Sequence, residues 1–240
     1  YIGKFDVLSD CWHNHWANSA LTKVYYSGTH SANYDAHQEK FDFLRSNVWE
    51  AVRAGWLLIE NIDRVPDLSE QEKKRMVAEA KCIIAARYFD TFRHYGGLPI
   101  IRSSFEGTSN DIPRGTVEET VNFMIQLLDE AKNDLPWVYE DMQNDAGRWT
   151  KAGAIGVKCK IWNFAASPLF NDNEAYYPGA TSLAIWYGGR KPELWDNCLE
   201  ACEEFFREWN NTYYQLERAT GSRPEDYRLA YRKGYSTHGR

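Results

Sequence analysis

The sequence has no excess of positive charge and no long apolar run, and each absence excludes a class of function. Lysine and arginine number 28 against 34 aspartate and glutamate residues, which gives a formal net charge of -6. A protein with this balance has no basic field to attract the phosphates of a nucleic acid. No stretch approaches the roughly 20 apolar residues that a membrane-spanning helix needs. We therefore expect no nucleic-acid partner and no transmembrane helix.

Motifs for catalysis and metal binding are also missing. The sequence has no nucleophile-elbow serine, no HExxH zinc motif and no glycine loop of the phosphate-binding kind. Possible zinc ligands occupy alternate positions near the start of the chain: Asp10, Cys11, His13 and His15. A structural zinc site brings a second pair of ligands at a characteristic distance, and none follows here. We predict no catalytic residue, no metal site and no cofactor.

Cysteine is sparse as well. The five cysteines are odd in number and widely scattered, and four of them fall inside helical patterns. Cys198 and Cys202 lie four residues apart on one helix face, a spacing that suits core packing at least as well as a disulfide. We interpret the cysteines as small core residues, which indicate no redox compartment.

Aromatic residues, in contrast, are abundant, with 10 Trp and 15 Tyr. Several lie in a leading segment, residues 1–44. This segment has no sustained periodic spacing of apolar residues and is rich in glycine, asparagine, serine and histidine. Flat rings stack on sugars while polar neighbours bind hydroxyl groups, and a sugar site needs that mixture. The candidate ligand-binding residues are Trp12, Trp16, Tyr25, Tyr26 and Tyr34. The alternative is that these rings cover the ends of helices, and Trp186 and Tyr187 have the same two interpretations.

Apolar residues recur at three- and four-residue steps in several segments, which is the pattern of amphipathic helices. Ser69 with Glu72, and Thr116 with Glu119, form capping boxes that satisfy the first amides of a helix. Thr150 caps a further helix. The predicted helices cover about residues 49–62, 70–95, 117–135, 151–166 and 193–209.

Five long helices with short capped turns, and hardly any alternating apolar-polar run, indicate an all-α domain of antiparallel helix pairs with little sheet. Their lengths suggest a tetratricopeptide-type solenoid, but there is no clean repeat of roughly 34 residues, so solenoid and bundle both stay open. We predict a single domain over residues 1–240. It comprises the irregular, aromatic-rich leading segment 1–44, a helical scaffold 45–210, and a loop with a truncated end 211–240.

Three stretches resemble, in the right order, the signature stretches of the SusD/RagB family. The first, residues 79–100, closes with the turn YGGLP, similar to the family's Tyr-Gly-Gly-x-Pro turn. The second, residues 113–136, is similar to the family's following helix. The third, residues 147–171, opens with GRWTK and closes with ASPLFN, which look like the family's Gly-Arg-x-Thr-Lys and Ala-Ser-Pro-Leu-Phe-Asn motifs.

The resemblance implies a SusD-like, tetratricopeptide-like fold and a non-enzymatic nutrient binder. Such a protein captures an oligosaccharide or other nutrient and delivers it to a SusC-like TonB-dependent transporter. The resemblance also implies a lipid-anchored position on the outer face of the outer membrane. Family members are mostly longer, so we expect this chain to correspond to their amino-terminal half. The family's signature residues are structural and its ligand contacts vary, so no binding residue is carried over.

Two other functions stay open. A helical scaffold whose only partners are proteins would bury the extra aromatic residues at a subunit interface. A small helical glycosidase would need two carboxylates across a glycosidic bond, and sequence alone cannot pair them because they come from distant positions. Glycan binding without bond breaking is the leading hypothesis. Binding would be modest and reversible, because a relay protein must release its sugar.

Overall fold

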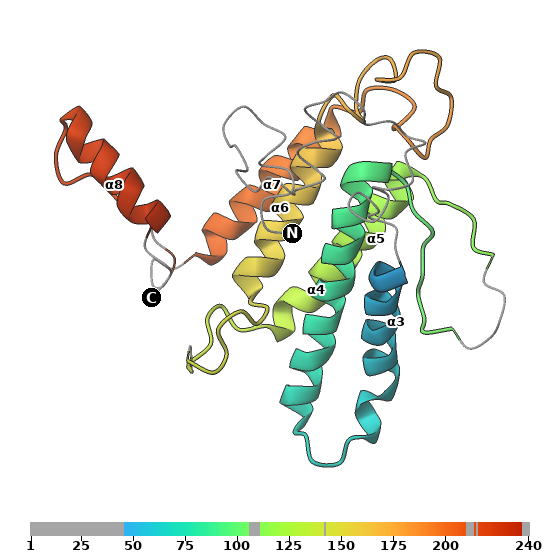
Figure 1. Ribbon diagram of the computed structural model, residues 1–240, viewed down its shortest axis with the longest axis horizontal. Helices are drawn as coiled ribbons and strands as arrows, with labels where there is room; N and C mark the ends of the chain where they lie inside the picture. The colour runs from blue at the N-terminus through green and yellow to red at the C-terminus, as the bar shows by residue number, and fades with distance from the viewer. Residues whose placement is uncertain (1–45, 106–110, 142, 210–213, 215, 237–240) are drawn as a thin grey trace, which may run out of the picture. The chain divides into compact units, whose positions relative to one another are not determined.

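The computed structural model describes residues 46–105, 111–141, 143–209, 214 and 216–236. Within these residues there are six α-helices and no strand, which confirms the predicted all-α class (Figure 1). The helices are α3 (Ser46–Asn61), α4 (Glu70–Tyr95), α5 (Val117–Ala131), α6 (Lys151–Ala166), α7 (Glu193–Glu208) and α8 (Pro224–Ser236). Two single 3-10 turns, η3 (Ile62–Arg64) and η4 (Lys132–Asp134), follow α3 and α5.

The described residues from Ala51 onward belong to the second of two compact units of the backbone. In the second unit α4 packs against α5, α5 against α6, and α6 against α7. The core is built from the inner faces of these helices, and its largest fully buried side chains include Tyr88, Phe92, Phe123, Leu128 and Ile155. The single domain over residues 1–240 stays a prediction.

The end of the chain differs from the sequence-based expectation. Residues 211–240 are predicted to be loop, but Pro224–Ser236 form α8. Pro224 occupies the first helical position, where its missing N–H costs nothing. Asp226 accepts hydrogen bonds from the Arg223 N–H at 3.1 Å and from its guanidinium at 3.2 Å, which closes the first turn. The helix lacks a sustained apolar stripe, so the three- and four-residue spacing of apolar residues did not predict it.

The predicted caps set the starts of three helices. Glu72 accepts a hydrogen bond from the Ser69 N–H at 2.8 Å while the Ser69 hydroxyl accepts from the Glu72 N–H at 3.3 Å. The same reciprocal pair joins Thr116 and Glu119, at 2.8 Å and 3.1 Å. The hydroxyl of Thr150 caps α6. All three caps confirm the sequence-based prediction.

The Gly96–Gly97 turn brings the loop segment around Ala184 against the end of α4. Gly96 has a φ of 74°, a conformation that glycine adopts without cost. The Gly97 N–H donates to the carbonyl of Ala184 at 2.7 Å. Arg114 donates from Nε to the Gly97 carbonyl at 2.6 Å and also bonds to the carbonyl of Tyr95. The glycines of the YGGLP turn are therefore required by a close backbone approach.

Asn171 closes the long loop between α6 and α7. Its side-chain oxygen accepts from the Lys191 N–H at 2.6 Å, and its amide donates to the Lys191 carbonyl at 3.0 Å. The amide also approaches the carbonyl of Ala166 at 3.4 Å. Asn171 is buried, so these backbone bonds hold both ends of the loop together away from water. The asparagine of the ASPLFN motif has a structural role.

Arg148, from the GRWTK motif, cross-links the start of α6 to α4. Its guanidinium donates to both carboxylate oxygens of Glu79, at 2.9 Å and 3.1 Å, and lies 4.8 Å from the ring centroid of Tyr139. Tyr139 itself donates to Glu79 at 2.7 Å. Burial, together with this carboxylate, raises the pKa of Tyr139 to about 12.

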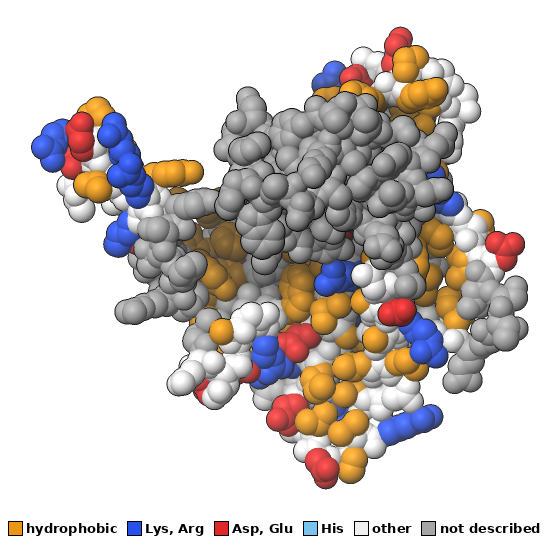
Figure 2. Space-filling view, in the orientation of Figure 1, with side chains coloured by type: hydrophobic (Ala, Val, Ile, Leu, Met, Phe, Trp, Pro, Cys, Tyr) orange, Lys and Arg blue, Asp and Glu red, His pale blue; other side chains and the backbone are white. Residues whose placement is uncertain are grey.

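On the face that Figure 2 shows, basic and acidic side chains of the described residues are interspersed.

Candidate ligand-binding pocket

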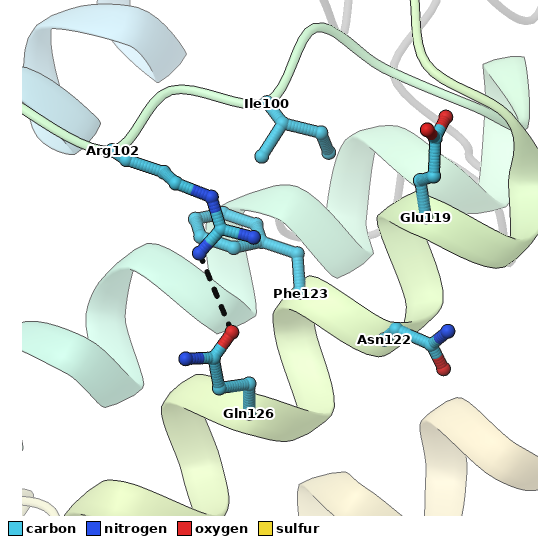
Figure 3. Close-up of a pocket in the computed structure, with 6 residues that line it drawn as sticks. All are labelled: Ile100, Arg102, Glu119, Asn122, Phe123 and Gln126. Atoms are coloured by element: carbon cyan, nitrogen blue, oxygen red, sulfur yellow. Dashed lines mark hydrogen bonds between the residues drawn. The ribbon is translucent and has the colours of Figure 1, made fainter.

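A pocket lies between one face of α5 and the extended segment that follows α4 (Figure 3). Its volume is about 370 Å³. It is lined by Ile100, Arg102, Glu119, Asn122, Phe123 and Gln126. The four residues from α5 are spaced at i, i+3, i+4 and i+7, so they share one face of the helix. We call this site the Arg102 pocket.

The wall formed by residues 98–101 is held in place by one buried and two partly buried hydrogen bonds. The Tyr88 hydroxyl donates to the Pro99 carbonyl at 2.7 Å and accepts from the Ile101 N–H at 2.9 Å. The Leu98 N–H donates to the Thr120 hydroxyl at 2.9 Å. Tyr88 is fully buried, and burial raises its pKa to about 12, so it stays a neutral donor at any physiological pH.

Two side chains of α3 also hold the backbone of this segment, at Ile101 and at Ser104. The Trp56 indole N–H donates to the Ile101 carbonyl at 3.0 Å. The Glu60 carboxylate accepts from the Ser104 N–H at 2.9 Å and from its hydroxyl at 2.5 Å. The hydrogen bonds from Ser104 lower the pKa of Glu60. Arg102 thus projects from a segment that is fixed on both sides.

Arg102 lies over the ring of Phe123, with its guanidinium carbon 4.8 Å from the ring centroid. Figure 3 shows its side chain reaching across that ring to Gln126, which accepts a hydrogen bond from Nη1 at 3.3 Å. Gln126 in turn donates to Glu130 at 2.8 Å, and Lys81 donates to the other oxygen of Glu130 at 2.8 Å. The hydrogen bond from Lys81 is the main cause of the lowered pKa of Glu130.

The other end of the Arg102 pocket carries Glu119 and Asn122. One oxygen of Glu119 accepts from the Thr116 N–H at 2.8 Å and from its hydroxyl at 3.0 Å. These bonds lower the pKa of Glu119, which is therefore ionised at neutral pH. Within the described residues, the second oxygen of Glu119 and the amide of Asn122 have no hydrogen-bond partner. Both are available to bind hydroxyl groups.

The lining of the Arg102 pocket offers polar and charged groups of the kind that bind polar ligands. The lining contains no serine, cysteine or histidine, so it offers no pair of nucleophile and imidazole base. No group of residues suited to hold a metal ion occurs in the described part of the chain. None of the described helices is long and apolar enough to cross a membrane. The pocket instead combines a cation, an anion, two amides and an apolar floor.

The sequence profile of the SusD-like family, described as "Starch-binding associating with outer membrane", matches residues 5–162, more than half of the chain. The chain belongs to the SusD-like family. A curated SusD-like protein of Formosa agariphila is 26% identical over 129 residues, which are 53% of this chain and 23% of that protein. The resemblance seen in the signature stretches is confirmed.

Solved structures show the same helical fold. BT4246 aligns with a TM-score of 0.63 at 22% identity, over 80% of this chain and 38% of its own. A SusD superfamily protein from Bacteroides thetaiotaomicron aligns with a TM-score of 0.52 at 22% identity, over 63% of this chain and 38% of its own. The chain therefore spans less than two fifths of the length of these relatives. The SusD-like, tetratricopeptide-like fold is confirmed.

The five predicted stacking residues of this SusD-like chain lie outside the described residues. Trp12, Trp16, Tyr25, Tyr26 and Tyr34 stay predictions. Of the second aromatic pair, Trp186 is half-buried and Tyr187 is 8% exposed. The ammonium of Lys191 lies 5.3 Å from the centroid of the Tyr187 ring. Tyr187 therefore fits the interpretation of a ring that covers the helical core.

No motif or residue spacing in the sequence singles out the Arg102 pocket. A signal existed, because Glu119, Asn122 and Gln126 mark a polar face on α5 opposite the predicted apolar stripe. Such a face is usually ordinary solvated surface. Helical periodicity alone cannot distinguish solvated surface from a ligand-binding pocket. The deciding partner, Arg102, lies in another segment.

Proposed function

We propose that this SusD-like chain is the helical part of a cell-surface glycan-binding protein. It captures an oligosaccharide and delivers it to a SusC-like TonB-dependent transporter in the outer membrane, without bond-breaking chemistry. The match of residues 5–162 to a family described by starch binding and outer-membrane association carries this proposal. The protein would act at the outer surface of the cell, held there by a lipid anchor.

Capture requires stacking faces and hydroxyl-binding groups. The rings of Trp12, Trp16, Tyr25, Tyr26 and Tyr34 are the proposed stacking residues. A few stacked rings and hydroxyl contacts, each worth about 1 kcal/mol net, give affinity that is useful yet reversible. This balance suits a protein that must pass its ligand on.

Quenching of tryptophan emission by a panel of plant, host and microbial oligosaccharides tests capture. We expect saturable quenching that is lost when Trp12 and Trp16 are both changed to alanine. Trp195→Ala is the matched control, because Trp195 is 46% exposed on α7 and does not belong to the leading segment 1–44. Quenching that survives the Trp12 and Trp16 changes but disappears in the control would contradict the proposed site.

Delivery is tested separately by co-purification. The protein, expressed in a bacterium that carries a SusC-like transporter encoded beside it, should be recovered with that transporter after detergent extraction of the outer membrane. Recovery without any transporter, while glycan binding persists, would leave capture standing and refute delivery.

A second function, a protein-protein scaffold without its own ligand site, is favoured by one feature of α7. Trp195, Leu199 and Phe206 are 46%, 59% and 62% exposed, and their spacing places them along one face. A row of exposed apolar residues of this size is typical of protein interfaces. Loss of a protein partner in Leu199→Glu, together with no response to any glycan, would favour the scaffold over capture.

A further inference from the structure

We propose that the Arg102 pocket binds an anionic sugar unit through its oxyanion, a carboxylate or a sulfate ester. This inference rests on the proposed glycan-binding function and adds a ligand class to it. The oxyanion pairs with the guanidinium of Arg102, and the ring hydroxyls reach Asn122 and Glu119.

The charge of Arg102 is the first reason. Its guanidinium has five N–H groups arranged as a fork, and among the described residues only the Gln126 side chain accepts from it. The nearby carboxylate of Glu130 is already bonded to Lys81 and Gln126. Arg102 forms no salt bridge among the described residues, although its charge helps to lower the pKa of Glu130. A guanidinium fork of this kind binds oxyanions with two parallel hydrogen bonds.

The second reason is preorganisation. Phe123, which is 1% exposed, supports the guanidinium from below, and Gln126 holds it from the side. The backbone that carries Arg102 is anchored at Ile101 and at Ser104. A cation that is fixed before binding loses little conformational entropy when the ligand arrives, which favours affinity.

The third reason is the spacing of the polar groups. Glu119 and Gln126 are seven residues apart on α5, which at the rise of an α-helix is about 10 Å. A ligand that fits along this face carries its negative group at the Arg102 end and its hydroxyls at the Glu119 end. At that separation solvent and salt screen the repulsion between the ligand anion and the Glu119 carboxylate. The volume of about 370 Å³ is suitable for a small part of a longer glycan.

Titration calorimetry on the full chain, at low and at physiological ionic strength, tests the inference. The probes are a trimer of galacturonic acid, the neutral trimer of galactose and a sulfated galactose trimer. We expect the acidic trimer to bind more tightly than the neutral one, with affinity that falls as salt rises. Arg102→Gln should weaken the acidic trimer by about tenfold and leave the neutral trimer unchanged.

Arg93→Gln is the matched control. Arg93 also lies over an aromatic ring, 5.3 Å from the centroid of Phe89, but on α4 and paired with Asp90 at 2.6 Å. It should leave all three affinities unchanged. Because Arg102 is exposed, Arg102→Gln should fold normally, and an unchanged circular dichroism spectrum and melting temperature would confirm that. Arg102→Lys keeps the charge but loses the fork, and should restore only part of the acidic affinity.

The two trimers with negative charge identify the source of the oxyanion. Binding of the galacturonic acid trimer alone assigns a carboxylate, and binding of the sulfated trimer alone assigns a sulfate ester. Equal binding of the acidic and neutral trimers, or equal effects of Arg102→Gln and Arg93→Gln, would overturn the inference. Glycan capture that depends on Trp12 and Trp16 would still stand in that case. Acidic binding through Arg102 without any Trp12 and Trp16 dependence would refute the proposed capture site alone.

Discussion

The ammonium of Lys158 donates to the carboxylate of Glu204 at 2.9 Å, and this bond joins α6 to α7. Lys158 also donates to Asp129 on α5 at 2.7 Å, and Lys132 contacts both carboxylates. Two cations and two anions from three helices and η4 thus form one network. The side chains of Lys158 and Glu204 are each only 14% exposed.

We expect Lys158→Ala to lower the free energy of unfolding by about 3 kcal/mol, because it leaves two partly buried carboxylates with one cation. Denaturant unfolding followed by circular dichroism measures this loss. The control is Arg207→Ala, which removes a pair at 3.8 Å whose side chains are each 60% exposed, and should cost under about 0.5 kcal/mol. Equal losses in the two variants would show that the network adds nothing beyond a surface pair.

Stability should fall in acid because of the same network. Burial alone would raise the pKa of Glu204, but hydrogen bonds from Lys132 and Lys158 outweigh burial and lower the pKa below the ordinary value of 4.5. A lowered folded-state pKa contributes stability that is complete above the unfolded value and is lost as the pH falls through the folded one. Glu204→Gln should therefore reduce the loss of melting temperature between pH 6 and pH 3. The exposed neighbour Glu203, changed to glutamine, should leave that loss unaltered.

Asn171→Ala should destabilise the protein by about 1–3 kcal/mol, because it leaves the partly buried N–H and carbonyl of Lys191 without their partners. Limited proteolysis should then cut within residues 172–190 faster than in the unchanged protein. Asn173→Ala, at an exposed position in the same loop, is the comparison and should behave like the unchanged protein. Equal cleavage rates in all three proteins would refute the role given to Asn171.

Two glycines should respond to alanine in opposite directions. A Cβ on Gly97 would lie 2.1 Å from the backbone oxygen of Gly115, so Gly97→Ala should cost about 3 kcal/mol or more. Gly156 lies inside α6, where an added Cβ would meet no side chain or neighbouring segment within 4 Å, so Gly156→Ala should stabilise by about 0.5–1 kcal/mol. Melting temperatures compare the two, and a stable Gly97→Ala protein would contradict the tight backbone approach.

Local signals predicted the helices well because a helix start depends on neighbouring residues. Ser69 with Glu72, and Thr116 with Glu119, are three residues apart, so sequence reasoning finds both partners together. The sequence predicted less well which individual side chains face the core. Ile83 and Ile84 both fit the apolar spacing of the predicted helix 70–95, yet Ile83 is 40% exposed and Ile84 is fully buried. Adjacent residues differ by about 100° around a helix, and only the position of the neighbouring helices selects one.

The helical class, the caps and the family could all be read from the amino-acid order, because each is written in short stretches of neighbouring residues. The same order placed aromatic residues in the leading segment, whose role stays a prediction. The Arg102 pocket, in contrast, emerged only from the packed helices. Arg102 and Phe123 belong to different segments. Their contact at 4.8 Å exists because Trp56 of α3, Tyr88 of α4 and Thr120 of α5 all hydrogen-bond to the chain that follows α4. No spacing in the sequence encodes a contact that depends on packing between helices.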